Sequence, residues 1–320
     1  MPLQTLFRLL PLCAAGMHGQ FERRGSLDAC PAIRGQSTHA LVIGDLGAPV
    51  FAFRRTAGLA LFPCVLGCFS PHIFMGAAQR RLGRRGVPLF AYHKIAPPPP
   101  ETRDPFLYVS LRRFDAQLAA LRNAGFASAP LNEVRAAKGN PQRKAVITFD
   151  DGCRNVLEHG LESLTRHGFR AIQFVVPAFM GRRNEWDIAK GDSPEELMDD
   201  AGIRQWLAAG HEIGSHSLTH RNLRQLDKAD LRSEIFDSKK SLEDRFGIRV
   251  EHFCYPFGSW NESVRDAVAE AGYATASTMD FGVSDSATPP FELRRIIPLS
   301  SMELLGKIRH RLARKIRKIS

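Results

Sequence analysis

The stretch KAVITFDDG, residues 144–152, decides how this sequence folds. An apolar run rich in β-branched residues ends in two adjacent carboxylates, Asp150 and Asp151, followed by Gly152. Such a run predicts a buried strand, and neighbouring residues of a strand point to opposite faces. Two adjacent carboxylates also repel each other, so one must take up a proton unless a cation lies nearby. Two interpretations follow: an Asp helix cap with an Asp-Gly turn, or a cation site.

Composition places the chain in the soluble globular class, with 320 residues, 44% hydrophobic and 24% charged. The net charge of +11 is uneven along the chain: residues 1–86 contribute +7, residues 301–320 contribute +6, and residues 87–300 contribute −2. The basic excess therefore belongs to the two ends, and the central part does not have the charge of a nucleic-acid-binding domain.

Residues 1–86 are the least readable part of the chain. The stretch 56–79 has no charged residue and is long enough to span a bilayer, although it contains two prolines. A membrane anchor or signal, a disordered extension and an overlong gene model are all open for residues 1–86.

The six cysteines show neither zinc-site spacing nor a disulfide framework, which leaves the redox compartment open. We favour the cell envelope, periplasmic or membrane-associated, over the cytoplasm.

From residue 87 onward, apolar runs alternate with helical patterns. The runs predict strands at 87–93, 144–149, 170–176, 211–215, 251–256 and 273–278. Glycine suits the left-handed position that ends a helix, and such glycines precede the strands five times, at Gly125, Gly168, Gly210, Gly247 and Gly272. The repeat of helix, glycine and strand predicts βα units and a mostly parallel sheet or barrel.

Polar residues follow the predicted strands at the points where they end. Asp150 and Asp151 follow one strand, His216 follows another, the PFG stretch at 256–258 follows a third, and His93 ends the first. The carboxyl ends of the strands are where βα barrels carry their chemistry. This convergence favours the cation interpretation of the aspartate pair over the turn.

The stretch HEIGSHSLTH contains His216 and His220, which lie on one face if a helical turn begins there. Two imidazoles at that spacing can bind one divalent cation, and Asp151 would complete a set of two histidines and one carboxylate. Such a set suits zinc or a similar transition metal and leaves a position for water. Asp150 would then stay ionised and act as general base. The alternative is a pair of ordinary surface histidines.

Three motifs resemble those of a known family. TFDDG at 148–152, HSLTH at 216–220 and CYPFG at 254–258 are similar to the first three motifs of the polysaccharide deacetylases, carbohydrate esterase family 4. The resemblance covers residues 87–300. It implies a distorted (β/α)7 barrel and metal-dependent removal of acetyl groups from an N-acetylated hexosamine polymer or glycolipid. It also implies that Asp150 is the catalytic base, and that Asp151, His216 and His220 bind the metal.

The third motif departs from the common pattern, because Cys254 stands where many members have arginine. The branch of poly-N-acetylglucosamine deacetylases, which this chain resembles, commonly has a small residue there. Phe257 matches the position whose backbone N–H stabilises the oxyanion. Tyr255 and Phe257 are also expected to form a wall of the substrate groove, with packing in the core as the alternative for both.

The usual C-terminal motif with a histidine is missing, and His310 lies in a basic helical setting. In the branch that this chain resembles, the motif order is permuted and the first strand carries the acid. The resemblance therefore implies that His93 is the general acid, with its ring near the metal on the side opposite Asp150. A buried structural histidine is the alternative.

Two further segments resemble the same branch. ELRRIIP at 292–298 implies that Arg295 holds Asp150 in place of the absent motif arginine, with Arg294 as the alternative. GRRNEWD at 181–187 implies that Trp186 and Asp187 border the sugar groove, or that they only anchor a loop.

Other readings have less support. Cys153 is expected to be a small buried residue rather than a nucleophile, and the chain has no Gly-x-Ser-x-Gly elbow. A glycosidase needs carboxylates about 5 Å or more apart on both sides of a sugar, which adjacent residues of one strand do not provide. A non-catalytic glycan-binding module is a third class.

The tail 301–320 is a basic amphipathic helix that either contacts an anionic membrane or polymer, or packs on the barrel.

Overall fold

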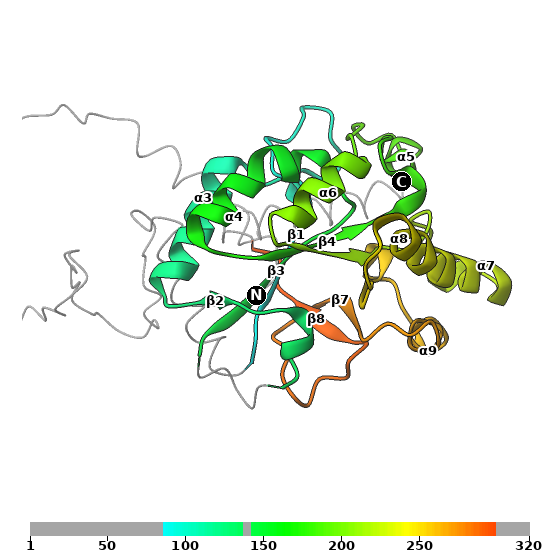
Figure 1. Cartoon of the computed structure of the whole chain (residues 1–320). Helices are drawn as coiled ribbons and strands as arrows, with labels where there is room; N and C mark the ends of the chain where they lie inside the picture. The colour runs from blue at the N-terminus through cyan, green and yellow to red at the C-terminus, as the bar shows by residue number, and fades with distance from the viewer. Residues whose placement is uncertain (1–85, 137–141, 299–320) are drawn as a thin grey trace, which may run out of the picture. The chain divides into compact units, whose positions relative to one another are not determined.

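The computed structural model of the chain describes residues 86–136 and 142–298 (Figure 1). The predictions for residues 1–85 and for the basic tail, including His310, lie outside these residues, so the domain boundaries stay predictions. No helix in the described ranges combines the length and the apolar character that crossing a bilayer requires.

Seven parallel strands form a nearly closed barrel. Their order around the barrel is the order of the chain, apart from the short strand β2 (Ala127–Ser128), which pairs with β3. The seven are β1 (Leu89–Tyr92), β3 (Lys144–Phe149), β4 (Ala171–Val175), β5 (Glu212–Ser215), β6 (His252–Cys254), β7 (Thr275–Phe281) and β8 (Leu293–Arg295). Ile296, directly after β8, exchanges backbone hydrogen bonds of 2.7 and 2.9 Å with Leu89 and Ala91 of β1. The predicted distorted (β/α)7 barrel is confirmed.

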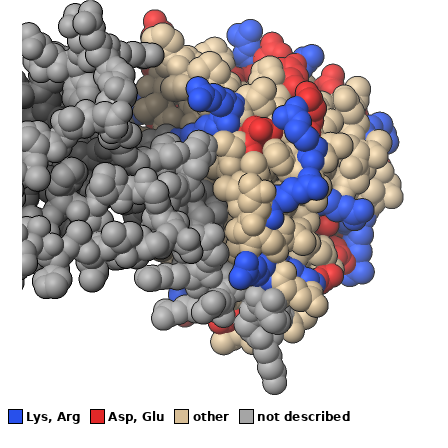
Figure 2. Space-filling model, turned by 90° about the vertical axis from the view of Figure 1, so that its left-hand side faces the viewer, with Lys and Arg blue, Asp and Glu red and all other residues tan. Residues whose placement is uncertain are grey.

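Helices lie around the outside of the barrel (Figure 1). They are α3 (Leu111–Asn123), α4 (Leu161–His167), α5 (Glu185–Ile188), α6 (Asp200–Ala208), α7 (Lys228–Arg232), α8 (Ser238–Phe246) and α9 (Glu262–Glu270). Two π-helical segments, Val156–Gly160 and Ser233–Asp237, join α4 and α8 to the residues before them. On the face seen in Figure 2, acidic side chains lie among the basic ones, in keeping with the small net charge of residues 87–300.

All six predicted strands are present, and the five glycines expected to end helices have left-handed φ angles between 67° and 85°. Strand β8 was not predicted. It has only three residues, and two of them are arginines, so no apolar run marks it. Leu293 and Arg295 are buried, whereas Arg294 between them is exposed. The alternation of a strand is present, but a charged residue occupies an inward position.

The core lies between the barrel and the helices. An aromatic cluster joins helix to strand, with the ring of Phe114 on α3 5.1 Å from that of Tyr92 on β1 and 5.6 Å from that of Phe149 on β3. Trp206 of α6 is fully buried, and its indole N–H donates to the carbonyl oxygen of Glu212 at 2.8 Å. These contacts hold the ends of β1 and β3 in place. His93 directly follows β1, and Asp150 directly follows β3.

Candidate active site and metal centre

A cavity of about 390 Å³ opens at the carboxyl end of the barrel. Its wall includes most of the residues that the sequence singled out, from four separate strand ends: His93, Asp150, Asp151, His216, His220, Tyr255 and Phe257. Residues up to 164 positions apart in the chain therefore meet in one place, as the parallel barrel predicts.

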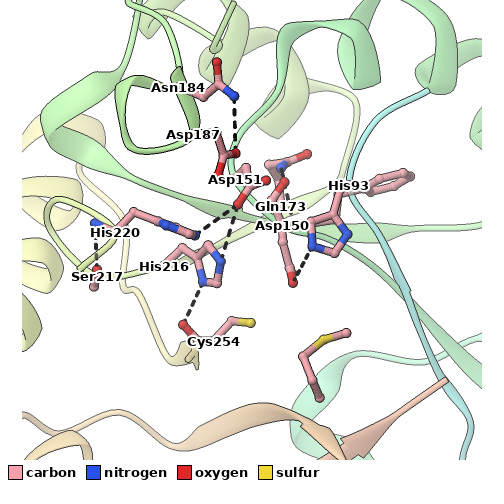
Figure 3. A network of polar contacts seen from close by, with 12 residues as sticks. His93, Asp150, Asp151, Gln173, Asn184, Asp187, His216, Ser217, His220 and Cys254 are labelled. Atoms are coloured by element: carbon pink, nitrogen blue, oxygen red, sulfur yellow. Dashed lines mark hydrogen bonds and ion pairs between the residues drawn. The ribbon is translucent and has the colours of Figure 1, made fainter. Parts of the chain in front are cut away.

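Asp151, His216 and His220 form a compact group of candidate metal ligands (Figure 3). The Oδ1 atom of Asp151 lies 3.5 Å from Nε2 of His216 and 3.3 Å from Nε2 of His220. All three side chains are buried, and one ligand atom from each falls within 4.8 Å of the others. Two imidazoles and one carboxylate are a donor set that zinc and similar ions accept.

The protonation of this group fits a bound cation. The Nδ1 atom of His216 lies 2.8 Å from the carbonyl oxygen of Cys254, so Nδ1–H must donate and the lone pair of Nε2 faces Asp151. Burial lowers the pKa of His216 to about 4 despite the nearby Asp150, so the ring is neutral at pH 7. Burial opposes ionisation of Asp151, but the hydrogen bond and charges of the neighbouring histidines hold its pKa well below the usual range. A carboxylate and an imidazole lone pair thus point at one spot.

The predicted helical turn between His216 and His220 is wrong. Residues 216–222 are irregular, and Ser217 and His220 have left-handed φ angles of 64° and 61°. The Ser217 hydroxyl accepts a hydrogen bond of 3.0 Å from the backbone N–H of His220 and closes this turn. The two imidazoles therefore converge because the backbone bends sharply, and not because they share a helix face.

Backbone strain is concentrated at the site. In the described ranges five residues other than glycine have a left-handed φ, and four of them line or adjoin the cavity: Asp151, Ser217, His220 and Phe257. Each such residue costs on the order of 1 kcal/mol or more and persists where the surrounding structure enforces it. The strain places the Asp151 carboxylate beside the two histidines.

Asp150 is held by Arg295. The guanidinium of Arg295 donates to Oδ1 and Oδ2 of Asp150 at 2.7 and 2.8 Å, and it also donates to the backbone oxygen of Thr278 at 2.8 Å. Burial of Asp150 opposes its charge, but Arg295 outweighs burial and lowers the pKa of Asp150 to about 2. Arg295 rather than Arg294 therefore contacts the carboxylate, and Asp150 is ionised at neutral pH.

His93 lies beside Asp150, with Nε2 3.7 Å from Oδ2 of the carboxylate (Figure 3). The expectation that its ring lies on the side opposite Asp150 is wrong. The reason is the strand register: Tyr92 of β1 pairs with Phe149 of β3, so the next residue of each strand is also adjacent. Burial lowers the pKa of His93 although Asp150 raises it, and the ring is neutral at pH 7.

The three predicted aromatic residues take different places. Tyr255 is fully buried against the cavity, and its hydroxyl donates to the carbonyl oxygen of Phe291 at 3.0 Å. Phe257 is half exposed on the cavity wall. Trp186 stacks on the ring of His220 at 4.5 Å and meets Phe179 at 5.3 Å. Trp186 thus packs against His220, one of the candidate metal ligands.

Sequence reasoning missed two polar residues that lie beside the site. Gln173 donates to the backbone oxygen of Asp150 at 3.1 Å, and Lys94 is buried beside the Tyr108 hydroxyl at 3.4 Å. Lys94 directly follows His93, so a charged residue after the first strand was the available signal. Cys153 is fully buried, and burial raises the pKa of its thiol well above the usual value, which agrees with a small packing residue.

These features define the class of the protein. A parallel βα barrel presents, at its carboxyl end, an arginine-held carboxylate, a neighbouring histidine and a separate group of three candidate metal ligands. A base beside a divalent-cation site is the arrangement of hydrolases in which a cation and a carboxylate act together on water.

Comparison with known proteins identifies the family. Residues 137–276 match the family model described as polysaccharide deacetylase. The chain therefore carries a polysaccharide deacetylase domain, and it belongs with hydrolases that act on carbon–nitrogen bonds other than peptide bonds.

Two curated proteins illustrate the similarity. Bacillus subtilis (strain 168) YxkH is 24% identical over 66% of this chain and 70% of its own length. The chitooligosaccharide deacetylase of Bradyrhizobium sp. (strain ANU 289) is 27% identical over 45% of this chain. The match spans 61% of that enzyme, which is less than two thirds of its length.

Solved structures support the fold. The deacetylase PplD of Streptococcus pyogenes, in complex with acetate, superposes with a TM-score of 0.59 at 22% identity and covers 69% of this chain and 97% of that one. IcaB from Ammonifex degensii superposes with a TM-score of 0.55 at 18% identity, covering 68% and 94%. At these identities the likeness shows the fold alone.

Proposed function

We propose that this chain removes the acetyl group from N-acetylhexosamine residues of a glycan or glycolipid, with zinc or a similar divalent ion bound by Asp151, His216 and His220. One observation carries the proposal: the three candidate ligands and the Asp150–Arg295 pair lie in the wall of one cavity. The names of relatives that act on chitooligosaccharide support this class of substrate.

A divalent ion at this site would polarise the acetyl carbonyl and lower the pKa of water toward neutrality. The chain's own residues supply the rest. Asp150, ionised and fixed by Arg295, orients the water and accepts its proton. The Phe257 backbone N–H is the proposed donor to the oxyanion, and Tyr255 closes the wall behind it.

The contact between Asp150 and His93 suggests how the leaving nitrogen gains its proton. His93 is neutral in the free site, so it must first take up a proton before it can act as an acid. Asp150 lies 3.7 Å away and is a much weaker base than an imidazole. A proton taken from water by Asp150 therefore passes downhill to His93, which then donates it to the sugar nitrogen as the C–N bond breaks.

The test is acetate release from a panel of N-acetylated glycans: chitooligosaccharides, poly-N-acetylglucosamine and peptidoglycan fragments. We expect release from at least one of them, loss of release after treatment with a chelator, and recovery after zinc is added back. Acetate release that a chelator does not change would contradict the metal assignment, and cleavage of glycosidic bonds without acetate would favour the glycosidase alternative.

We also propose a cell-envelope location, because a relative matching 48% of this chain at 22% identity is named peptidoglycan-N-acetylglucosamine deacetylase PgdA, from Listeria monocytogenes. Cell fractionation followed by immunodetection tests this proposal. Recovery of the full-length chain in the cytoplasmic fraction alone would contradict it.

A further inference from the structure

Asp187 is a carboxylate of the cavity wall that the proposed chemistry does not use. It belongs to α5, and its side chain is 17% exposed. It lines the same cavity as Asp151, and Figure 3 shows it between Asn184 and Asp151. A carboxylate in this position either anchors its loop, binds a cation or contacts the substrate.

The loop does not depend on Asp187 as an anchor. Asn184 is 1% exposed, and its side-chain oxygen accepts a hydrogen bond of 2.6 Å from the backbone N–H of Glu195. The backbone N–H of Asn184 donates in turn to the carbonyl oxygen of Glu195 at 3.1 Å. These two bonds tie the segments together, and the Asn184 side chain then reaches Oδ2 of Asp187 at 3.3 Å. Asn184 thus positions the carboxylate.

Asp187 has few partners for a carboxylate. Its side chain accepts from Asn184 at 3.3 Å and pairs with Lys190, whose Nζ lies 3.7 Å from Oδ1, and the charge of the buried Lys94 also acts on it. A carboxylate can accept about four hydrogen bonds, so Asp187, which lines the cavity, keeps capacity to accept from a ligand there. Burial and the charge of Asp151 raise the pKa of Asp187, and the charges of Lys94 and Lys190 oppose that rise. A carboxylate on the cavity wall whose side chain holds little structure is better explained by a ligand.

The ligand is not a metal ion. Asp187 belongs to neither compact group of candidate metal ligands in the described part of the chain, which are Asp151, His216 and His220, and Asp150, His216 and Cys254. The ammonium group of Lys190 beside it also repels a cation. An acceptor and a donor 3.7 Å apart instead match neighbouring hydroxyl groups, which donate to one and accept from the other. The same ammonium lies over the ring of Phe257, 4.1 Å from its centre, so the donor, the acceptor and a half-exposed aromatic residue form one part of the cavity wall.

We infer that Asp187 and Lys190 bind hydroxyl groups of the sugar ring that carries the acetamide, and that Asn184 fixes Asp187 for this contact. The inference rests on the proposed function for the nature of the substrate. It makes Asp187 a residue that determines sugar specificity, separate from the ligands and the base that act on the acetyl group.

The test compares wild type with Asp187→Asn, and uses Glu185→Gln as the control. Glu185 is an exposed carboxylate of the same short helix and pairs with Arg182. Binding of a chitooligosaccharide to the zinc-loaded protein is measured by calorimetry, whether or not hydrolysis occurs. A hydrogen bond to a charged group corresponds to at least about tenfold in affinity. We expect Asp187→Asn to weaken binding by that factor, with zinc content retained, and Glu185→Gln to bind like wild type.

A second readout separates sugar binding from chemistry. For Asp187→Asn, the fall in kcat/KM for the oligosaccharide should exceed the fall for an aryl acetate, which has no sugar, by about tenfold, and KM should carry the difference. Equal falls on both substrates, loss of zinc, or unchanged oligosaccharide binding would each overturn the inference. Wild type that binds the oligosaccharide without releasing acetate would contradict the proposed function, while weaker binding by Asp187→Asn would still support the subsite.

Discussion

Strand β5 has a histidine directly before it and another directly after it, and the two show how differently the ends of the barrel are built. His211 and His216 are both buried, and burial is the main reason that both have a pKa near 4. At His211, the backbone N–H of Ala171 donates to Nδ1 at 3.1 Å. At His216, Nδ1 itself donates to a carbonyl oxygen. The two rings therefore carry their proton on opposite nitrogens.

This difference decides what each histidine can do. The His211 ring stacks on Trp206 at 4.3 Å, and its lone pair is consumed by a backbone group. The His216 lone pair faces Asp151 and is available to a cation. The wider surroundings follow the same division, since the carboxyl end of the barrel holds four of the five strained residues in the described ranges and the buried pair of Asp150 and Arg295. Stability must therefore come from the apolar packing between strands and helices, and function from the end that this packing supports.

The largest effect is expected at the functional end. His216→Ala or His220→Ala should lose bound zinc and with it acetate release, by more than the roughly hundredfold that loss of an outer-shell partner costs. Zinc content by elemental analysis and acetate release are the measurements. His211→Asn is the matched control at the other end of β5, and it should keep its zinc. Stoichiometric zinc with normal turnover in either alanine variant would remove that residue from the ligand set.

A substitution in the core is expected to lower stability and to leave zinc binding unchanged. Leu118 is fully buried on α3, and Leu118→Ala should lower the free energy of unfolding by about 3 kcal/mol through lost burial and the cavity left behind. Denaturant unfolding measures this, and the zinc affinity of the folded variant should not change. Leu111→Ala, at a 45% exposed position of the same helix, is the control and should cost little. A change in zinc affinity in Leu118→Ala would show that the two regions are coupled.

Much of the barrel could be predicted because its signals are local. Apolar runs marked six strands, and glycines marked five helix ends, since each depends on a few neighbouring residues. The candidate ligands were predictable because parallel strands bring their carboxyl ends together. Strand β8 was not, because Arg295 occupies a buried strand position that partners distant in the chain make acceptable, above all Asp150, 145 residues away.

The remaining errors have the same origin. The turn between His216 and His220 was expected to be helical from spacing alone, but left-handed residues bend it, and strain of that kind leaves no periodic pattern. The position of His93 followed from strand register, which apolar runs do not reveal. For Asp187 the resemblance left two roles open, bordering the sugar groove or anchoring a loop, and the contacts of Asn184 and Lys190, which spacing does not reveal, favour the first.

A smaller effect on turnover is expected from the base than from the ligands. Asp150→Asn should lower turnover by about a hundredfold, the scale of a positioned general base, while zinc stays bound. Because the change also leaves Arg295 buried without a full partner charge, thermal unfolding should be recorded, and activity compared well below the melting temperature. Asp151→Asn, which should lose zinc, is the comparison. Equal loss of zinc in both variants would make Asp150 a ligand.

The smallest effect concerns the histidine that precedes β5. Burial, with a smaller contribution from Arg170, lowers the pKa of His211 from 6.5 to about 4 in the folded state. Between these values the unfolded chain binds a proton that the folded chain does not, so the free energy of unfolding falls as the pH drops from about 6.5 to about 4. The shift corresponds to about 3 kcal/mol at most. Protonation would also remove the lone pair that accepts from Ala171.

Urea unfolding of the zinc-free protein at pH 7, 5.5 and 4.5 measures this loss, and His211→Asn isolates it. An asparagine oxygen can still accept from Ala171 but does not titrate, so the variant starts less stable at pH 7, having lost the stacking on Trp206, and then declines less steeply. His252, whose pKa burial also lowers to about 4, keeps titrating in both proteins, so the difference in slope belongs to His211 alone. If the two slopes are equal, His211 is already protonated in the fold, and the tautomer that distinguishes it from His216 is wrongly assigned.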